Sequence, residues 1–209
     1  SRHQKGVVAE GYIKEARQKI AATLKVDPKE FIITSGGTES NNMALIGTAL
    51  AAKRKGNHII TTAVEHPSVK ATASFLEEQG FRITFLSVDS RGQISLEDLK
   101  EALTPDTILV SIMYVNNEIG TIQPVEEAAK LVHATVPGAV FHVDAIQAYG
   151  KVMIRPKQQG IDLLSVSSHK FHGPKGAGFL YCSSKVNLHP IIFGGGQQSG
   201  MRSGTENVP

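Results

Sequence analysis

The chain has 209 residues, of which 41% are hydrophobic and 20% charged, so it can bury the core of an ordinary globular protein. Its net charge of +3 comes from scattered basic residues and does not favour nucleic-acid binding. No apolar run approaches the roughly 18 to 20 residues of a membrane span, and no signal peptide is recognisable. The single cysteine, Cys182, excludes an internal disulfide, so we expect a soluble, cytoplasmic protein without a membrane or nucleic-acid partner.

Helical and strand patterns alternate from residue 10 onward. Capping signals mark the helices: Pro67 stands at the first position of one and Gly80 past its end, and Gly56 is the expected C-cap of another. Ser95 and Asp98 have the spacing of a cap and its reciprocal acid. Helices are predicted over residues 10–24, 38–56, 67–79, 95–103 and 124–136. Strands are predicted over residues 31–34, 58–63, 81–88, 107–115, 139–144, 162–168 and 176–182.

The predicted strands are apolar throughout and are separated by helices. This pattern indicates one α/β domain with a mostly parallel sheet and helices on both faces. Ligands of such sheets bind outside the carboxyl ends of the strands. Polar and reactive residues follow five of the strands, in the segments SGGTESNN, EHPS, NNEIGT, DAIQ and HK. A functional site is therefore expected at one edge of the sheet.

Gly36, Gly37 and Thr38 lie between a strand and the start of a helix. Glycines let the backbone approach a ligand closely, and the free N–H groups and dipole of a helix N-terminus favour an anion. The alternative is an ordinary turn with Thr38 as the N-cap of the helix. The lysine of a nucleoside-triphosphate loop is missing, so such a site is not expected.

Asp144 ends an apolar strand, where its carboxylate could cap the next helix, pair with a buried cation or, with His142, bind a metal. His142 and Asp144 share one face of the strand, but no third ligand has suitable spacing, and we predict no metal site. His66 could be an ordinary surface histidine. The remaining histidines near this region do not form a metal-binding set either: His169, His172 and His189.

Lys170 follows a buried strand and precedes the Gly/Pro-rich segment FHGPKG. We expect such a lysine to have a partner rather than lie in water, although a buried stem with an exposed ammonium is common. In a desolvated site a lysine becomes a nucleophile that can form a Schiff base. An anion cradle, an acid, a histidine and a lysine at one edge are together what pyridoxal 5′-phosphate (PLP) requires.

Six segments carry a resemblance to a known family: TSGGTESNN, EHPSV, VNNEIGTIQP, HVDAIQAYGK, SSHKFHGPKGAGFLY and GGGQQSGMRSGTENV. Their sequence and order resemble the cysteine desulfurase (NifS/IscS-like) group of the class V aminotransferases, which are fold-type I PLP enzymes. The resemblance runs over nearly the whole chain. It implies that residues 1–209 are the PLP-binding large domain, without the family's N-terminal segment and C-terminal small domain.

The resemblance also implies roles for residues around the cofactor ring. Lys170 would form the Schiff base and serve as the base for the α-proton, which makes it catalytic together with His66. His66 would stack on the ring and move protons. Asp144 would pair with the pyridinium nitrogen, and Gln147 would donate to the phenolic oxygen.

Further residues would hold the phosphate and the substrate. Thr38, Ser167 and His169 would bind the phosphate, beside the backbone of the glycine turn. Asn117 would contact the cofactor or the substrate carboxylate. Thr205 would reach across a homodimer interface to the phosphate of the partner.

The family reaction converts L-cysteine to L-alanine and leaves the sulfur as a persulfide on an enzyme cysteine, for iron–sulfur cluster or thio-cofactor synthesis with an acceptor or scaffold protein. The acceptor cysteine and the arginine for the substrate carboxylate would follow residue 209. Cys182 ends a strand and is expected to be a buried structural thiol. Residues 1–209 alone are expected to be inactive.

Other functions stay open at this point. A selenocysteine lyase or a class V aminotransferase would use the same cofactor, and the region after residue 209 would distinguish them. A non-catalytic scaffold domain of the same fold would not need the lysine. A phosphate- or nucleotide-binding domain without PLP would make Lys170 incidental.

Overall fold

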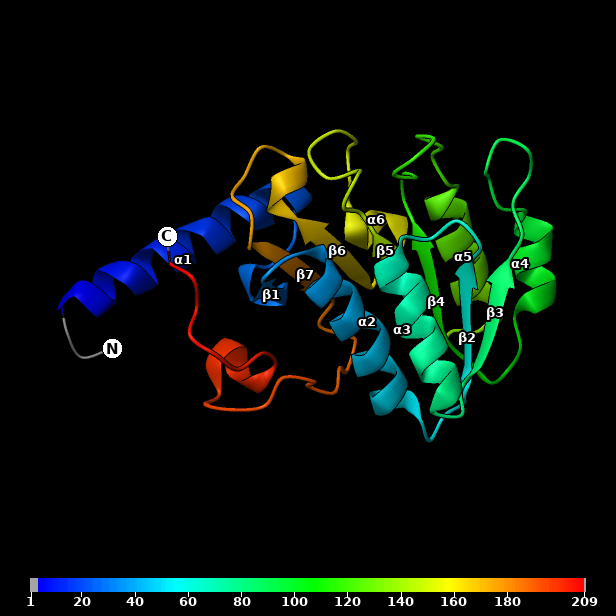
Figure 1. The fold of residues 1–209 in the computed structure, drawn as a ribbon, viewed down its shortest axis with the longest axis horizontal. Helices are drawn as coiled ribbons and strands as arrows, with labels where there is room; N and C mark the ends of the chain where they lie inside the picture. Colours follow the sequence, from blue (N-terminus) through cyan, green and yellow to red (C-terminus); the bar gives the residue numbers. More distant parts are fainter. Residues whose placement is uncertain (1–3, 209) are drawn as a thin grey trace.

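Seven strands form one sheet in the computed structural model, which describes residues 4–208 (Figure 1). They are β1 (Phe31–Thr34), β2 (His58–Thr62), β3 (Arg82–Leu86), β4 (Thr107–Met113), β5 (Val140–Asp144), β6 (Leu163–Ser167) and β7 (Gly178–Cys182). Their order is β1-β7-β6-β5-β4-β2-β3. Strands β3, β2, β4, β5 and β6 are parallel, whereas β7 is antiparallel to both neighbours. The predicted mostly parallel sheet is confirmed.

Helices cover both faces of this sheet, as the alternating pattern predicts. They are α1 (Gln4–Leu24), α2 (Gly37–Ala52), α3 (Pro67–Glu78), α4 (Leu96–Ala102), α5 (Val125–Thr135) and α6 (Pro156–Gln159). Three 3₁₀ turns complete the structure: η1 (Pro28–Glu30), η2 (Ser168–Lys170) and η3 (Gln197–Gly200). Within the described part of the chain, none of the helices has the length and hydrophobicity needed to cross a membrane.

The core consists of two layers, one on each face of the sheet. Side chains of α2 and α3 pack in one layer, and those of α4, α5 and the end of α1 pack in the other. Neighbouring strand residues point to opposite layers, because side chains alternate along a strand: Ile59 packs with α2 and α3, and Ile60 packs in the opposite layer. Both faces of the sheet are therefore covered by apolar side chains, so a polar site is expected at the strand ends.

Two helix boundaries differ from prediction by more than one residue. Helix α1 starts at Gln4 rather than at residue 10. Its first half extends beyond the sheet (Figure 1), and Val7, Val8 and Tyr12 are exposed, so no buried face marks it in the sequence. Helix α2 ends at Ala52, so Gly56 is not its C-cap. A Cβ on Gly56 would lie 2.2 Å from the carbonyl oxygen of Asp106, so close backbone packing explains this glycine instead.

Other capping predictions are confirmed. Pro67 is the first residue of α3, and Gly80, with a φ of +89°, lies past its end. The Ser95 side chain accepts from the Asp98 N–H at 3.2 Å and caps α4. The reciprocal bond to the Asp98 carboxylate is not present among the hydrogen bonds of the described residues.

Candidate active site

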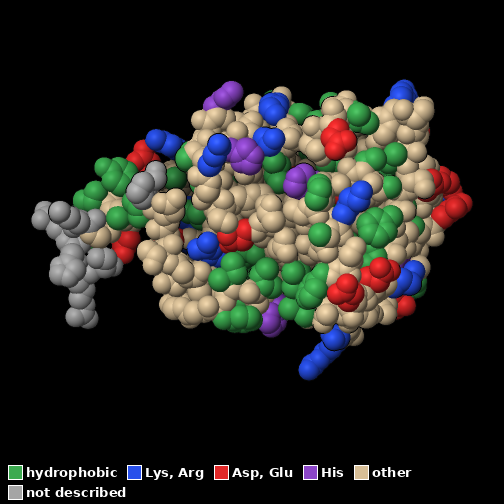
Figure 2. Space-filling model, viewed as in Figure 1, with side chains coloured by type: hydrophobic (Ala, Val, Ile, Leu, Met, Phe, Trp, Pro, Cys, Tyr) green, Lys and Arg blue, Asp and Glu red, His purple; other side chains and the backbone are tan. Residues whose placement is uncertain are grey.

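A cavity of about 240 Å³ opens where β4, β5 and β6 end and α2 begins. Histidine, lysine and arginine side chains gather on this part of the surface, at the top of Figure 2. The cavity is lined by Gly37, Thr38, His66, Met113, Val115, Asn117, Asp144, Ile146, Gln147, Ser167, His169 and Lys170. Every predicted site residue except Thr205 is therefore brought to one place by the fold.

One end of the cavity is formed by the start of α2 and the end of β6. The N-cap of α2 is Gly36 and Thr38 is its second residue, so the alternative with Thr38 as N-cap is wrong. Ser167 Oγ and His169 Nδ1 share a hydrogen bond of 2.8 Å. A Cβ on Gly178 in β7 would lie 2.8 Å from the Gly36 Cα, so glycine there lets the turn pack against the sheet. Hydroxyl, imidazole and helix N–H groups thus converge, as an anion requires.

Asp144 lines the cavity from the end of β5. Its carboxyl group is buried; Oδ1 accepts from the Ile146 N–H at 3.0 Å, and Oδ2 accepts from Asn41 Nδ2 at 2.8 Å. The carboxylate therefore caps a turn rather than a helix. Burial raises its pKa above the ordinary value, against the effect of both hydrogen bonds and of nearby His66.

His142 does not join Asp144 in a metal site. Its ring is fully buried and bonded at both nitrogens to serine hydroxyls, Ser111 at 2.8 Å and Ser165 at 2.9 Å. Burial lowers its pKa to about 3, so the ring is neutral. Among residues 4–208 no three His, Cys, Asp or Glu side chains are grouped to hold a metal. His142 is a structural residue between three strands.

His66 is the half-buried N-cap of α3 and lines the cavity, so it is not an ordinary surface histidine. Its Nδ1 accepts from the Ser68 N–H at 3.1 Å and lies 2.8 Å from Ser68 Oγ. Because a backbone N–H can only donate, Nδ1 carries no proton, and the neutral ring is protonated at Nε2.

Sequence reasoning missed two buried polar residues behind the cavity. Asn41, in the second turn of α2, reaches both Asp144 and Ser68. Glu65 accepts from Thr62 Oγ1 at 2.8 Å and from the Met113 N–H at 2.9 Å, which links the His66 loop to β4. Burial, with a contribution from Asp144, raises the pKa of Glu65 to about 8. Nothing in single-residue spacing distinguishes either residue from a surface polar residue.

Lys170 ends the turn η2, directly after β6. Its side chain lines the cavity but is exposed, and its ammonium group makes no hydrogen bond or ion pair with the described residues. The expectation that this lysine would be kept from water by a partner is therefore wrong for the structure. The 3₁₀ turn redirects the chain at the strand end and carries the side chain to the rim.

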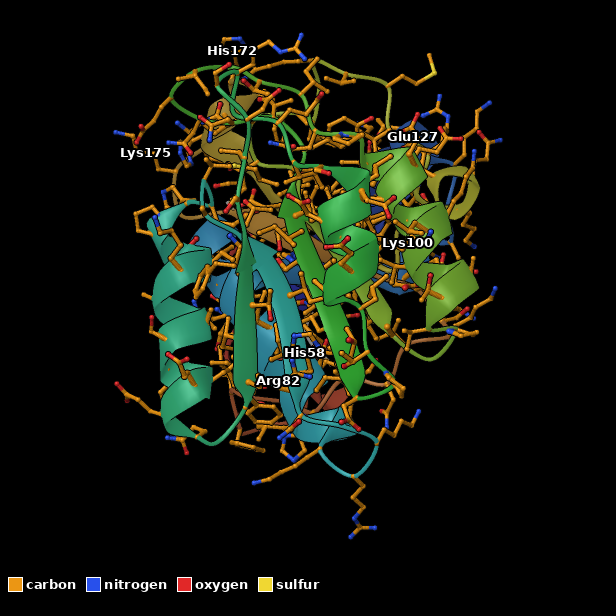
Figure 3. All side chains as sticks on the ribbon, turned by 90° about the vertical axis from the view of Figure 1, so that its right-hand side faces the viewer. His58, Arg82, Lys100, Glu127, His172 and Lys175 are labelled. Atoms are coloured by element: carbon orange, nitrogen blue, oxygen red, sulfur yellow. The ribbon has the colours of Figure 1, made fainter. Side chains whose placement is uncertain are left out.

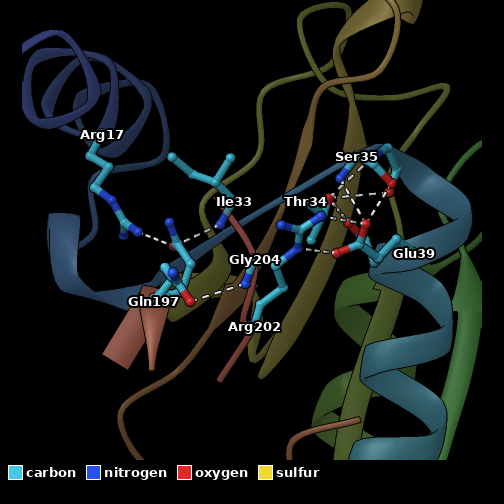
Figure 4. A network of polar contacts seen from close by, with 11 residues as sticks. Arg17, Ile33, Thr34, Ser35, Glu39, Gln197, Arg202 and Gly204 are labelled. Atoms are coloured by element: carbon cyan, nitrogen blue, oxygen red, sulfur yellow. Dashed lines mark hydrogen bonds and ion pairs between the residues drawn. The ribbon is translucent and has the colours of Figure 1, made fainter. Parts of the chain in front are cut away.

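Thr205 lies outside the cavity and is exposed, on a segment fixed to the site by polar contacts (Figure 4). Arg202 Nε lies 2.7 Å from Glu39 Oε1, in the first turn of α2. Burial opposes ionisation of Glu39, but hydrogen bonds from Arg202 and Ser35 bring its pKa below the ordinary value. Gln198 accepts from Arg17 and from the Ile33 N–H. The segment is thus held beside the anion end, whereas the proposed contact with a partner is a prediction.

The basic side chains at the two ends of the sheet have different surroundings. Figure 3 shows His172 and Lys175 above the end where the cavity opens, and His58 and Arg82 at the opposite end. His58 is buried between Thr107 and Thr84, and burial, with Arg82 nearby, lowers its pKa to about 4. His58 is therefore neutral and structural, whereas Arg82 at the same end of the sheet is exposed.

Comparison with known proteins identifies the family. A model of the aminotransferase class-V family matches residues 1–209. The chain belongs to the aminotransferase class-V family. This membership confirms the family that the six sequence segments indicate.

Individual relatives within this family are named for one activity. The chain is 52% identical over 207 residues to a putative cysteine desulfurase, IscS 1, of Bacillus subtilis, covering 99% of the chain and 54% of that protein. It is 52% identical over 196 residues to the cysteine desulfurase IscS of Dictyoglomus turgidum, covering 94% of the chain and 49% of that protein. The chain thus spans about half the length of the curated relatives it matches.

Solved structures of the family share the fold over the whole chain. A NifS-like protein superposes with a TM-score of 0.97 at 44% identity, over 100% of this chain and 57% of the other. A structure described as SspA in complex with cysteine gives a TM-score of 0.95 at 40% identity, over 100% of this chain and 60% of the other. The predicted fold-type I arrangement is confirmed by these similarities.

Proposed function

We propose that this chain is the PLP-binding part of a PLP-dependent cysteine desulfurase. The observation that carries the proposal is a single cavity that joins an amine, a buried carboxylate and a set of anion donors, from Lys170, Asp144 and the start of α2. The names of the relatives described above favour L-cysteine as the substrate over a 2-oxo acid or selenocysteine. A non-catalytic scaffold would have no need for this complete set.

The chemistry of the donors present supports PLP as the group that this cavity holds. Thr38, Ser167 and His169 offer two hydroxyls and an imidazole at a helix N-terminus, which suits a phosphate. Asp144 offers a buried carboxylate with N–H donors on both oxygens, which suits a protonated ring nitrogen. Lys170 offers an amine at the rim of the same cavity.

Bound PLP would supply a protonated aromatic ring that accepts the electron pair left at the α-carbon of an amino acid. Lys170 Nζ would hold the aldehyde end of the group, and its free amine would be the base for the α-proton. Asp144, as a carboxylate, would hold the ring nitrogen in its protonated form. His66, protonated at Nε2, would lie against the ring, and Gln147 and Asn117 would donate to the phenolic oxygen and the substrate.

The sulfur acceptor is proposed to lie elsewhere in the full-length protein. Cys182 lies at the end of β7, where burial raises the pKa of its thiol to about 12. Such a thiol is a poor nucleophile near neutral pH. Thr205 of one protomer is proposed to complete the phosphate site of its partner in a cytoplasmic homodimer, and an acceptor or scaffold protein would receive the sulfur.

The activity is tested by adding L-cysteine to the full-length protein loaded with PLP and measuring L-alanine together with protein-bound persulfide. Equal amounts of both products are expected, and neither is expected from the Lys170→Ala variant. Amino-group transfer to a 2-oxo acid without sulfur release would instead establish an aminotransferase. Faster turnover of selenocysteine than of cysteine would establish a selenocysteine lyase.

A further inference from the structure

A chain of buried hydrogen bonds runs behind the cavity from Asp144 to His66. Asn41 is fully buried, and its Nδ2 lies 2.8 Å from Asp144 Oδ2 and 2.9 Å from Ser68 Oγ. Ser68 Oγ in turn lies 2.8 Å from His66 Nδ1. The amide of Asn41 therefore links the side chain that would hold the nitrogen of a cofactor ring to the side chain that would lie against that ring.

The direction of each bond in this chain is fixed by chemistry. The two hydrogens of the Asn41 amide serve Asp144 and Ser68, and the amide oxygen has no partner among the described residues. Reversing the amide would place that oxygen against the Asp144 carboxylate, so the carboxylate holds this orientation. Ser68 Oγ then accepts from Asn41, which leaves its own hydrogen for His66 Nδ1. Each hydrogen bond in this chain therefore has one possible donor and one possible acceptor.

We infer that Asn41 is a positioning residue that keeps Asp144 a carboxylate and, through Ser68, keeps the His66 ring protonated at Nε2 and facing the cavity. The inference rests on the proposed function, since it names what would prepare both side chains for the ring. A buried carboxylate without such donors takes up a proton readily, because burial disfavours its charge. Asn41 is the donor from α2, the helix that also forms the anion end.

Several titratable groups surround Asp144 and bear on its ionisation. His66 favours the charged form of Asp144, and the Glu65 carboxyl group lies close enough to interact with it. His142, on β5 itself, is neutral. His169 and Lys170 line the same cavity from the turn η2, which follows β6. The Asn41 substitution replaces none of these groups, and the Ser68→Ala variant separates an effect through His66 from loss of the Asn41 donor to Asp144.

The test compares three variants of the full-length protein. Asn41→Leu removes both N–H donors at similar volume, and Ser68→Ala cuts only the link to His66. Asn57→Ala is the matched control, because Asn57 is exposed and precedes β2 at the opposite end of the sheet. ¹³C NMR of labelled aspartate follows Asp144 and ¹⁵N NMR of labelled histidine follows His66, both without PLP. Titration with PLP then gives its dissociation constant as a function of pH.

The Asn41→Leu variant is expected to titrate Asp144 at higher pH than wild type. It should bind PLP about ten- to a hundredfold more weakly at pH 7, the range for one hydrogen bond to a charged group, and recover affinity as pH rises. Ser68→Ala should move the His66 Nδ1 resonance and leave the Asp144 midpoint in place. Asn57→Ala should change neither the Asp144 midpoint nor the His66 Nδ1 resonance.

An Asp144 midpoint that is the same in wild type and Asn41→Leu would overturn the inference. Should Asn41→Leu fail to fold, an unchanged His66 Nδ1 resonance in Ser68→Ala would overturn it instead. The NMR midpoints need no cofactor, so they decide the role of Asn41 even for a protein that binds no PLP. Absence of PLP binding by wild type would refute the proposed function alone.

Discussion

Replacing Glu65 by glutamine should make the chain more stable at alkaline pH. The Glu65 carboxyl group is buried with Oε2 unpartnered among the described residues, and burial raises its pKa from 4.5 to about 8. Between these values the folded chain keeps a proton that the unfolded chain releases, so the free energy of unfolding falls as pH rises through this window. Glutamine keeps the size and the acceptor for Thr62 and Met113 but cannot ionise.

The magnitude follows from about 1.4 kcal/mol for each pH unit separating the two pKa values. Relative to wild type, Glu65→Gln should gain about 3 to 5 kcal/mol in free energy of unfolding between pH 4.5 and pH 9. Urea unfolding followed by circular dichroism at several pH values measures both proteins. Glu78→Gln is the control, since Glu78 is exposed on α3, and it should follow the wild-type curve. A Glu65→Gln difference that does not vary with pH would refute the reasoning.

Three further predictions concern packing and reactivity. Cys182 should react with iodoacetamide roughly a hundredfold more slowly in the folded than in the unfolded chain at pH 8, measured by mass spectrometry, and equal rates would contradict its raised pKa. Gly178→Ala should lower the free energy of unfolding by about 1 to 3 kcal/mol, because its Cβ would overlap the turn before α2. Arg202→Ala should lower the free energy of unfolding by about 1 to 2 kcal/mol, because it removes the partly buried ion pair to Glu39. Arg91→Ala removes an exposed ion pair and should lower it by less than about 1 kcal/mol. Urea unfolding measures the stability of these three variants, and equal losses of stability for the two arginine variants would contradict the structure.

Much of the fold and the place of the site could be predicted from the sequence. Apolar strands separated by helices indicate a covered parallel sheet, and the polar segments after five of the strands mark the edge where the cavity lies. Asp144 and His66 could be placed because each directly follows or ends a strand pattern. Local pattern and global fold agree in these segments.

The remaining features depend on contacts between distant segments. Asn41 and Glu65 become part of the site only when α2, the β2–α3 loop and β4 pack together, and a polar residue in a helix or loop carries no sign of this. The exposure of Lys170 depends on the turn η2 at the end of β6. Val7, Val8 and Tyr12 of α1 are exposed, so hydrophobic periodicity could not mark the start of this helix.

The central claim, that Lys170 is the residue that binds PLP covalently, is tested most directly by trapping. The full-length protein is incubated with PLP, reduced with borohydride, digested and mapped by mass spectrometry. We expect one modified peptide that carries the group on Lys170, and none from the Lys170→Ala variant. Modification spread over other exposed lysines, with Lys170 unmodified in a folded protein, would contradict the account.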